Sequence, residues 1–255
     1  NNRIVVLDRY YKLKFTITTF RNGQGVMDSL SAPQGVFVSE RYIWVCDTGA
    51  NRIVVYPGAN MTLTEGDIDR ALDTAPDALY LQLEIAHAAV LYAAKEAAAR
   101  GIPVFMDAGP ADATFALEEL PPLAVFSPNE TETFTYTGIM PIGAESSLRA
   151  SLELYKRVRA KYIVIKQGER GAFIYDGKRY YMIPAVKAGQ TVDTTAAGDT
   201  FTAAMTLRYL ENGGDIKDAV RYGAAAGALT VSRKGASASV PSKDEVLAFL
   251  EKNRY

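Results

Sequence analysis

The sequence is poor in the residues that build disulfides and metal centres. Its 255 residues include one cysteine, one histidine and one tryptophan. A lone Cys46 excludes an intrachain disulfide, so a reducing cytoplasm is the simpler expectation for its location. With so few Cys and His residues, we expect no zinc site. His87 is expected to be a polar residue at a helix start rather than a base or a ligand.

Charge of one sign and long apolar runs are also missing. The 28 basic and 29 acidic residues give a net charge of −1, and the basic residues form no long patch. This composition argues against a nucleic-acid partner. No apolar run approaches the ~20 residues of a membrane helix, and residues 1–8 do not follow the pattern of a signal peptide. We therefore expect a globular chain that binds small molecules rather than nucleic acid or membrane.

The first fifty residues have the pattern of short strands and turns. Strands are expected at 3–7, 12–19, 34–39, 42–46 and 52–56, and the string Asn-Arg-Ile-Val-Val occurs at both 2–6 and 51–55. Together with the Pro-Gln-Gly-Val string at 33–36, this order resembles an NHL repeat, one blade of a β-propeller. Single repeats bury little apolar surface, and at least about 3 are normally needed for stability. We expect residues 1–51 to pack on the remainder, to pair with another chain or to be poorly ordered.

Strands and helices alternate from about Pro57 onward. Strands are expected at 79–83, 102–106, 124–126, 162–166, 172–175 and 179–183, and helices at 87–100, 130–136, 146–159, 198–211, 216–232 and 243–253. Such alternation is typical of an α/β fold with a mostly parallel sheet. We predict two regions, a short all-β segment at 1–51 and an α/β domain at 52–255.

The segment 192–201, Val-Asp-Thr-Thr-Ala-Ala-Gly-Asp-Thr-Phe, is the most informative. Small residues precede a predicted helix, whose unpaired N–H groups and partial positive charge form an anion site. Asp199 in the first turn could remove a proton from a hydroxyl beside that site. The structural alternative is an ordinary helix start with an acidic first turn. From these residues alone, the two interpretations are about equally supported.

This segment resembles the C-terminal signature of the ribokinase family of carbohydrate kinases. Further family elements occur in order at 56–60, 82–84, 107–111, 127–132, 166–171, 232–236 and 239–241, so the resemblance covers about 52 to 250. It implies a three-layer αβα fold and ATP-dependent phosphorylation of a sugar hydroxymethyl group, with D-ribose as the first expectation. ATP, Mg²⁺ and a monovalent cation, K⁺, are the implied cofactors.

The resemblance also implies a role for each matching residue. Asp199 would be the base, Ala196, Ala197 and Gly198 would hold the transferring phosphoryl group, and Glu84 would approach the sugar. The nucleotide and its Mg²⁺ would lie near Asn129, Glu132, Lys166, Gly168, Gly171 and Ala224. The cation loop would comprise Asp193, Thr195, Thr230, Arg233, Gly235 and Ser239. Structural alternatives remain: Asn129 could cap a helix, Gly168 and Gly171 could be turn glycines, and Glu84 could be an ordinary strand-end acid.

The family's sugar-binding and lid elements are not recognisable in residues 1–50. The string at 51–55 fits both the NHL repeat and the kinase lid, which suggests a recombined or designed chimera. A non-catalytic nucleotide-binding or scaffold protein is therefore the alternative to a sugar kinase, and assembly through propeller blades is a third. The resemblance implies pairing through the lid, so we expect the loss of the lid to weaken that dimer, and a homo-oligomer stays an open alternative. The sequence does not identify the sugar.

Overall fold

The computed structural model describes the backbone of residues 4–7, 13–21, 27–31, 33–38, 43–47, 52–56 and 58–253, and the side chains of 16–19, 27–31 and 60–253. The chain divides into two compact units. The first comprises 1–64 and 84–86, and the second comprises 65–83 and 87–255. The division falls after the predicted boundary at 51/52 because β7 (Arg52–Tyr56) pairs with β6 (Ile43–Asp47).

The first unit contains small antiparallel sheets. β1 (Ile4–Leu7) pairs with β2 (Leu13–Ile17), and β3 (Thr19–Arg21) pairs with β4 (Met27–Ser29). β5 (Pro33–Val38), β6 and β7 form a three-stranded sheet. The short all-β segment is thus observed where the backbone is described. The NHL-type repeat at 2–55 stays a prediction, because 8–12, 22–26, 39–42 and 48–51 lie outside the described residues.

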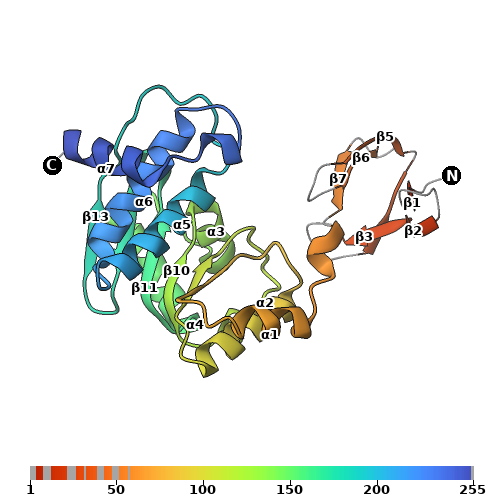
Figure 1. Ribbon diagram of the computed structural model, residues 1–255, viewed down its shortest axis with the longest axis horizontal. Coiled ribbons are helices and arrows are strands. Elements are labelled where there is room, and N and C mark those ends of the chain that lie inside the picture. Colours follow the sequence, from red (N-terminus) through yellow and green to blue (C-terminus); the bar gives the residue numbers. More distant parts are fainter. Residues whose placement is uncertain are drawn as a thin grey trace. The chain divides into compact units, whose positions relative to one another are not determined.

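The second unit is built on a six-stranded sheet of order β13-β12-β11-β10-β9-β8. β8 (Leu79–Leu81), β9 (Val104–Asp107), β10 (Leu123–Ser127) and β11 (Ala160–Lys166) are parallel. β12 (Ala172–Tyr175) and β13 (Tyr180–Ile183) complete it as an antiparallel hairpin. This is the mostly parallel sheet that the sequence predicts (Figure 1).

Helices cover both faces of this sheet. On one face lie α5 (Ala197–Glu211) and α6 (Ile216–Val231), whose Met205 and Val220 pack with Phe105 and Ile174. Strand residues alternate between faces, so Tyr175 points the other way, where it meets Tyr155 of α4 (Ala144–Arg157). α2 (His87–Ala99) connects β8 to β9 as a crossover, which by the right-handed rule lies on the α4 face. The predicted three-layer αβα architecture is confirmed.

The remaining helices are short. They are α1 (Glu65–Leu72), α3 (Glu130–Thr137) and α7 (Lys243–Lys252), with 3₁₀ turns at Gly58–Met61, Leu117–Glu119, Gly168–Arg170 and Ser237–Ser239. α1 was not expected from the sequence. The other helix boundaries differ from the predicted ones by at most two residues.

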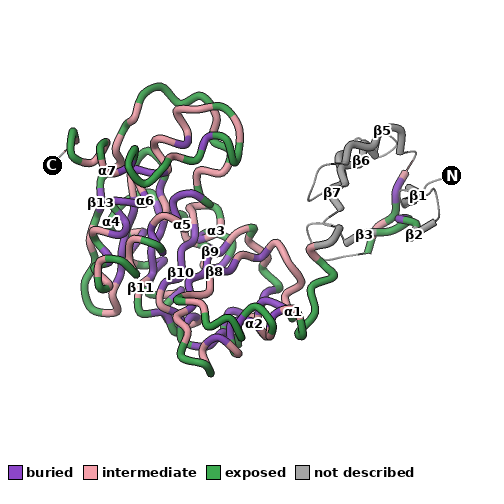
Figure 2. The backbone as a smooth tube through the Cα atoms, viewed as in Figure 1, coloured by how far each residue is buried: buried purple, intermediate pink, exposed green. Residues whose placement is uncertain are grey.

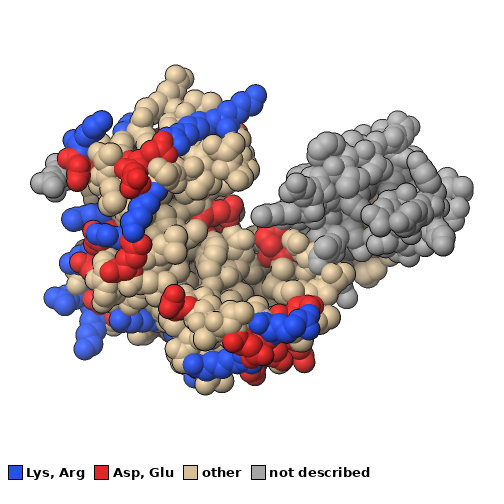
Figure 3. Space-filling model, viewed as in Figure 1, with Lys and Arg blue, Asp and Glu red and all other residues tan. Residues whose placement is uncertain are grey.

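The core of the second unit is apolar and its surface is charged. Buried residues follow the central strands and the inner helix faces (Figure 2). Acidic and basic side chains are interspersed over the face shown in Figure 3. Within the described residues, no helix has the length and apolar character needed to cross a bilayer.

Candidate active site

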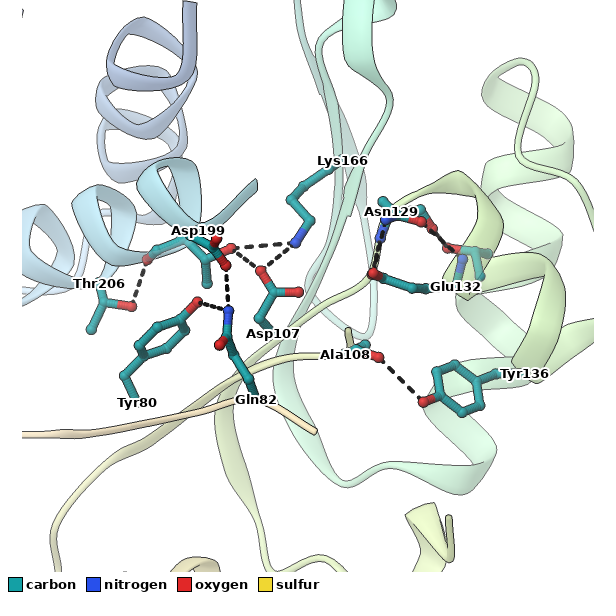
Figure 4. A network of polar contacts seen from close by, with 12 residues as sticks. Tyr80, Gln82, Asp107, Ala108, Asn129, Glu132, Tyr136, Lys166, Asp199 and Thr206 are labelled. Carbon is teal, nitrogen blue, oxygen red and sulfur yellow. Dashed lines mark hydrogen bonds and ion pairs between the residues drawn. The ribbon is translucent and has the colours of Figure 1, made fainter. Parts of the chain in front are cut away.

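Polar residues gather where the parallel strands of the second unit end. Gln82 follows β8, while Asp107 and Lys166 are the last residues of β9 and β11. Carboxyl ends of parallel strands meet at one edge of the sheet, where open α/β folds bind ligands. The start of α5 approaches the same edge and contributes Asp199 (Figure 4). Thr202 follows in the next turn and donates to Asp107.

The start of α5 has the geometry of an anion site. Ala196 adopts the left-handed conformation at φ 61°, which reverses the chain immediately before the helix. Gly198 and Asp199 follow in the first turn and are exposed. N–H groups in a first turn lack intrahelical acceptors and carry the partial positive charge of the helix. The predicted position of Asp199 in this turn is confirmed.

A buried ion pair lies beneath this helix start. Lys166 Nζ is 2.5 Å from Asp107 Oδ2, and the Thr202 hydroxyl donates to the same oxygen at 2.7 Å. Both charged side chains are nearly enclosed, with exposed fractions of 11% for Lys166 and 5% for Asp107. A methyl group added to Gly198 would stand 3.8 Å from Nζ. The Lys166 side chain therefore points toward the start of α5.

A second network reaches Asp199 from β8. The Gln82 amide donates to Asp199 Oδ1, and it also lies 3.3 Å from the Tyr80 hydroxyl. Burial, followed by the nearby Asp107 and Asp199 carboxylates, raises the pKa of Tyr80. Tyr80 therefore stays a neutral phenol throughout the physiological range.

Asn129 and Glu132 form a reciprocal capping box at α3. The Asn129 side chain accepts from the Glu132 N–H at 2.9 Å, and Glu132 Oε2 accepts from the Asn129 N–H at 2.7 Å. This confirms the structural interpretation of Asn129 as a cap. Burial raises the pKa of Glu132, and Lys166 opposes that shift. Gly109 passes so close that a methyl group there would meet Glu132 Oε1.

The loop after β11 contains two glycines that its conformation requires. Gly168 has φ 50° and Gly171 has φ 93°. A methyl group on Gly171 would also lie 2.0 Å from the Ile183 carbonyl oxygen. The interpretation as turn glycines is thus confirmed, and it leaves their role toward a nucleotide as a prediction. Ala224 lies partly buried on α6.

The predicted cation-loop residues come from two segments that the structure joins. Asp193 Oδ1 accepts from the Thr195 N–H at 3.0 Å, and Oδ2 accepts from the Gly235 N–H at 3.0 Å. A hydrogen bond from the Thr195 side chain, together with these two backbone bonds, lowers the pKa of Asp193 to about 2. Thr230 and Ser239 are buried, and their hydroxyls donate to the backbone carbonyls of Ala226 and Ala236. Arg233 pairs with Glu245. Residues 193–195 and 230–235 thus lie side by side, as a cation site formed by both segments would require.

Two further expectations concern Glu84 and His87. Glu84 belongs to the first unit, where its carbonyl accepts from the Asn60 amide at 3.2 Å. Its approach to the sugar stays a prediction. His87 begins α2 and lies 3.5 Å from an Asp112 oxygen, as expected for a polar residue at a helix start.

Four residues of the site were not singled out from the sequence as site residues. They are Tyr80, Gln82, Asp107 and Thr202, which join the strand ends to α5. Gln82 and Asp107 both lie in or beside segments that resemble the kinase family. Polar residues at the ends of apolar strands were the available signal, but their partners lie far away in the chain.

Comparisons with known proteins agree with this geometry. Residues 40–243 match the sequence model of the pfkB family carbohydrate kinases. The chain is 34% identical over 209 residues to the ribokinase of Staphylococcus aureus, covering 81% of this chain and 68% of that one. It is also 34% identical over 216 residues to the bifunctional ribokinase/ribose-5-phosphate isomerase A of Fructilactobacillus sanfranciscensis, covering 84% of this chain and 39% of that one.

A solved structure shares the fold. Ribokinase of Arabidopsis thaliana complexed with ribose and ATP superposes with a TM-score of 0.69 at 31% identity, covering 80% of this chain and 66% of that one. This chain thus spans between about two fifths and two thirds of the length of these relatives. The family match over most of the chain, together with the α/β fold, shows that the chain belongs to the pfkB family of carbohydrate kinases.

Proposed function

We propose that this chain transfers the γ-phosphoryl group of ATP to the hydroxymethyl group of a sugar, with D-ribose as the first substrate to test. The observation that carries the proposal is Asp199, an exposed carboxylate in the first turn of α5 beside the N–H groups of that turn. A base next to an anion site is the pairing that phosphoryl transfer to a hydroxyl needs. The ribokinase relatives support both the reaction and the sugar.

In this mechanism Asp199 accepts the proton of the sugar hydroxyl while the hydroxyl oxygen attacks the γ-phosphorus. The new O–P bond forms as the bond between phosphorus and the β,γ-bridging oxygen breaks, and ADP leaves. The Gly198 N–H stabilises the negative charge on the transferring group. The Ala197 N–H donates to the Thr194 carbonyl at 3.3 Å, and it would leave that long contact to bind the transferring group. The left-handed turn at Ala196 reverses the chain immediately before these residues.

The nucleotide would occupy the same edge of the sheet. The loop containing Gly168 and Gly171 follows β11, and the α6 segment at Ala224 packs beside α5. Asn129 and Glu132 would face the phosphates from the start of α3. The positive φ of both glycines, together with the open space around Gly168, supports a loop whose backbone can follow a flat ligand.

Mg²⁺ fits the charge of this site. Glu132 interacts electrostatically with Asp107, Asp199 and Lys166, so three carboxylates share one ammonium group. Within the described residues, no three acidic, His or Cys side chains group closely enough to hold a metal directly. Glu132 and Asn129 would therefore hold Mg²⁺ largely through water, which suits its reluctance to dehydrate. When bound, Mg²⁺ neutralises phosphate charge.

K⁺ would lie in the loop that Asp193 closes. Both Asp193 oxygens accept backbone N–H groups, which leaves backbone oxygens of the two joined segments to face a cation. The proposed ligands come from Asp193, Thr195, Thr230, Arg233, Gly235 and Ser239. A site of this kind next to α5 would hold the anion site in shape.

The deciding experiment measures ADP formation with D-ribose, ATP, Mg²⁺ and K⁺ for three proteins. Asp199→Asn should lower kcat by at least about a hundredfold, while the Kd of ATP changes less than about twofold. The matched control is Asp67→Asn, because Asp67 is also an aspartate in the first turn of a helix, α1. This variant should keep wild-type turnover. Nucleotide binding without turnover in the wild-type protein would favour the non-catalytic alternative.

A further inference from the structure

Gln82 is the described residue whose side chain holds the Asp199 carboxylate. Its amide donates to Asp199 Oδ1, across the boundary between the end of β8 and the start of α5 (Figure 4). Gln82 is partly buried, whereas Asp199 is exposed. An exposed aspartate on its own would sample several rotamers, so this contact selects one.

The amide is itself fixed in orientation. Its second N–H points to the Tyr80 hydroxyl at 3.3 Å, so both donors have acceptors. The reversed amide would set its carbonyl oxygen against the carboxylate, which is repulsive. The neutral Tyr80 hydroxyl accepts from Gln82 and also interacts with Thr202 of α5. Tyr80 thus supports Gln82 from the buried side.

The two carboxylate oxygens of Asp199 have different surroundings. Oδ1 is occupied by Gln82, and no other described side chain or backbone group donates to Oδ2. A base needs one oxygen directed at the hydroxyl proton and a fixed plane for the carboxylate. We propose that Gln82 is a positioning residue that orients Asp199 and leaves Oδ2 for the proton of the substrate hydroxyl. This inference rests on Asp199 being the base of the proposed function.

Three variants test the role. Gln82→Met keeps the length and removes both donors. Gln82→Glu keeps the shape of the side chain and sets a carboxylate against Asp199. Tyr80→Phe removes only the hydroxyl that accepts from Gln82. A hydrogen bond to a charged group accounts for about a tenfold to hundredfold effect. We expect kcat to fall in that range for Gln82→Met, further for Gln82→Glu and about threefold for Tyr80→Phe, with the Kd of ATP unchanged.

A control variant and a double-mutant cycle distinguish a positioning role of Gln82 from a purely structural one. Tyr92→Phe removes a hydrogen bond from α2 to Asp69 of α1, away from the site, and should leave kcat unchanged. In the Asp199→Asn background, Gln82→Met should lower the residual rate no further, because its effect passes through Asp199. An equal loss in both backgrounds would overturn the inference.

A structural readout keeps the inference independent of turnover. Crystal structures of the wild-type protein and Gln82→Met should show one Asp199 rotamer in the first and several in the second. An unchanged Asp199 rotamer in Gln82→Met would overturn the inference even if the protein proved inactive. Loss of the proposed function alone would instead appear as a wild-type protein without turnover in which Gln82 still orders Asp199.

Discussion

Lys166 and Asp107 form an ion pair of 2.5 Å between the ends of two parallel strands, with the Thr202 hydroxyl on the same carboxylate oxygen. Neither partner has much contact with solvent. Burying two charges is costly unless each is paired and hydrogen-bonded. The pair therefore constrains how α5, which carries Asp199, sits on the sheet.

Removing one partner of this pair should be strongly destabilising. Lys166→Met leaves Asp107 as a buried, unpaired carboxylate, and we expect a loss of about 3–5 kcal/mol in the free energy of unfolding. Adding Asp107→Asn should recover most of that loss, because the uncompensated charge is gone. Urea unfolding of the single and double variants measures both effects. Equal stabilities of the two variants would show that charge balance is not the cause.

Gly171 should tolerate alanine worse than other glycines of positive φ. Its added methyl group would lie 2.0 Å from the Ile183 carbonyl oxygen, whereas Gly138, at φ 70°, has open space around it. Gly138→Ala should cost about 1–2 kcal/mol of unfolding free energy from backbone strain alone. Gly171→Ala should cost more and shift the β12–β13 hairpin. Similar losses for both variants would contradict the close contact.

The capping role of Asn129 can be distinguished from a role in ATP binding by comparison with a second helix cap. Asn129 caps α3 and Ser242 caps α7, each in a capping box. Asn129→Ala and Ser242→Ala should each lower the unfolding free energy by about 1 kcal/mol. Only Asn129→Ala should also weaken ATP binding in the presence of Mg²⁺, as measured by calorimetry. Unchanged ATP affinity in that variant would leave Asn129 as a cap only.

Asp193 should contribute a pH-dependent part of the stability. Hydrogen bonds from the Thr195 side chain, the Thr195 N–H and the Gly235 N–H lower its pKa from 3.8 to about 2 in the folded protein. Because the folded-state pKa is depressed, this contribution is fully present above about pH 4 and is lost as the pH falls toward 2. The Tm difference between wild-type protein and Asp193→Asn should therefore shrink across that interval. A difference independent of pH from 5 to 2 would refute the assignment.

The sequence by itself determined the class of fold and the position of Asp199 at a helix start. Alternating apolar strands and helices predicted the parallel sheet, and the run of small residues before Phe201 placed Asp199 in a first helical turn. Both features depend on local periodicity and on the residues that begin helices, so neighbouring residues are sufficient to encode them. The helix α1 at Glu65–Leu72 was not predicted, although Ile68 and Leu72 have helical spacing and are both buried.

Only the tertiary structure decided which polar side chains meet. Gln82 and Asp199 lie 117 positions apart, and Asp107 and Thr202 lie 95 apart. Their contacts follow from the order of strands in the sheet and from the packing of α5 across the strand ends. Pairing between distant residues depends on that packing, which no local pattern in the chain specifies.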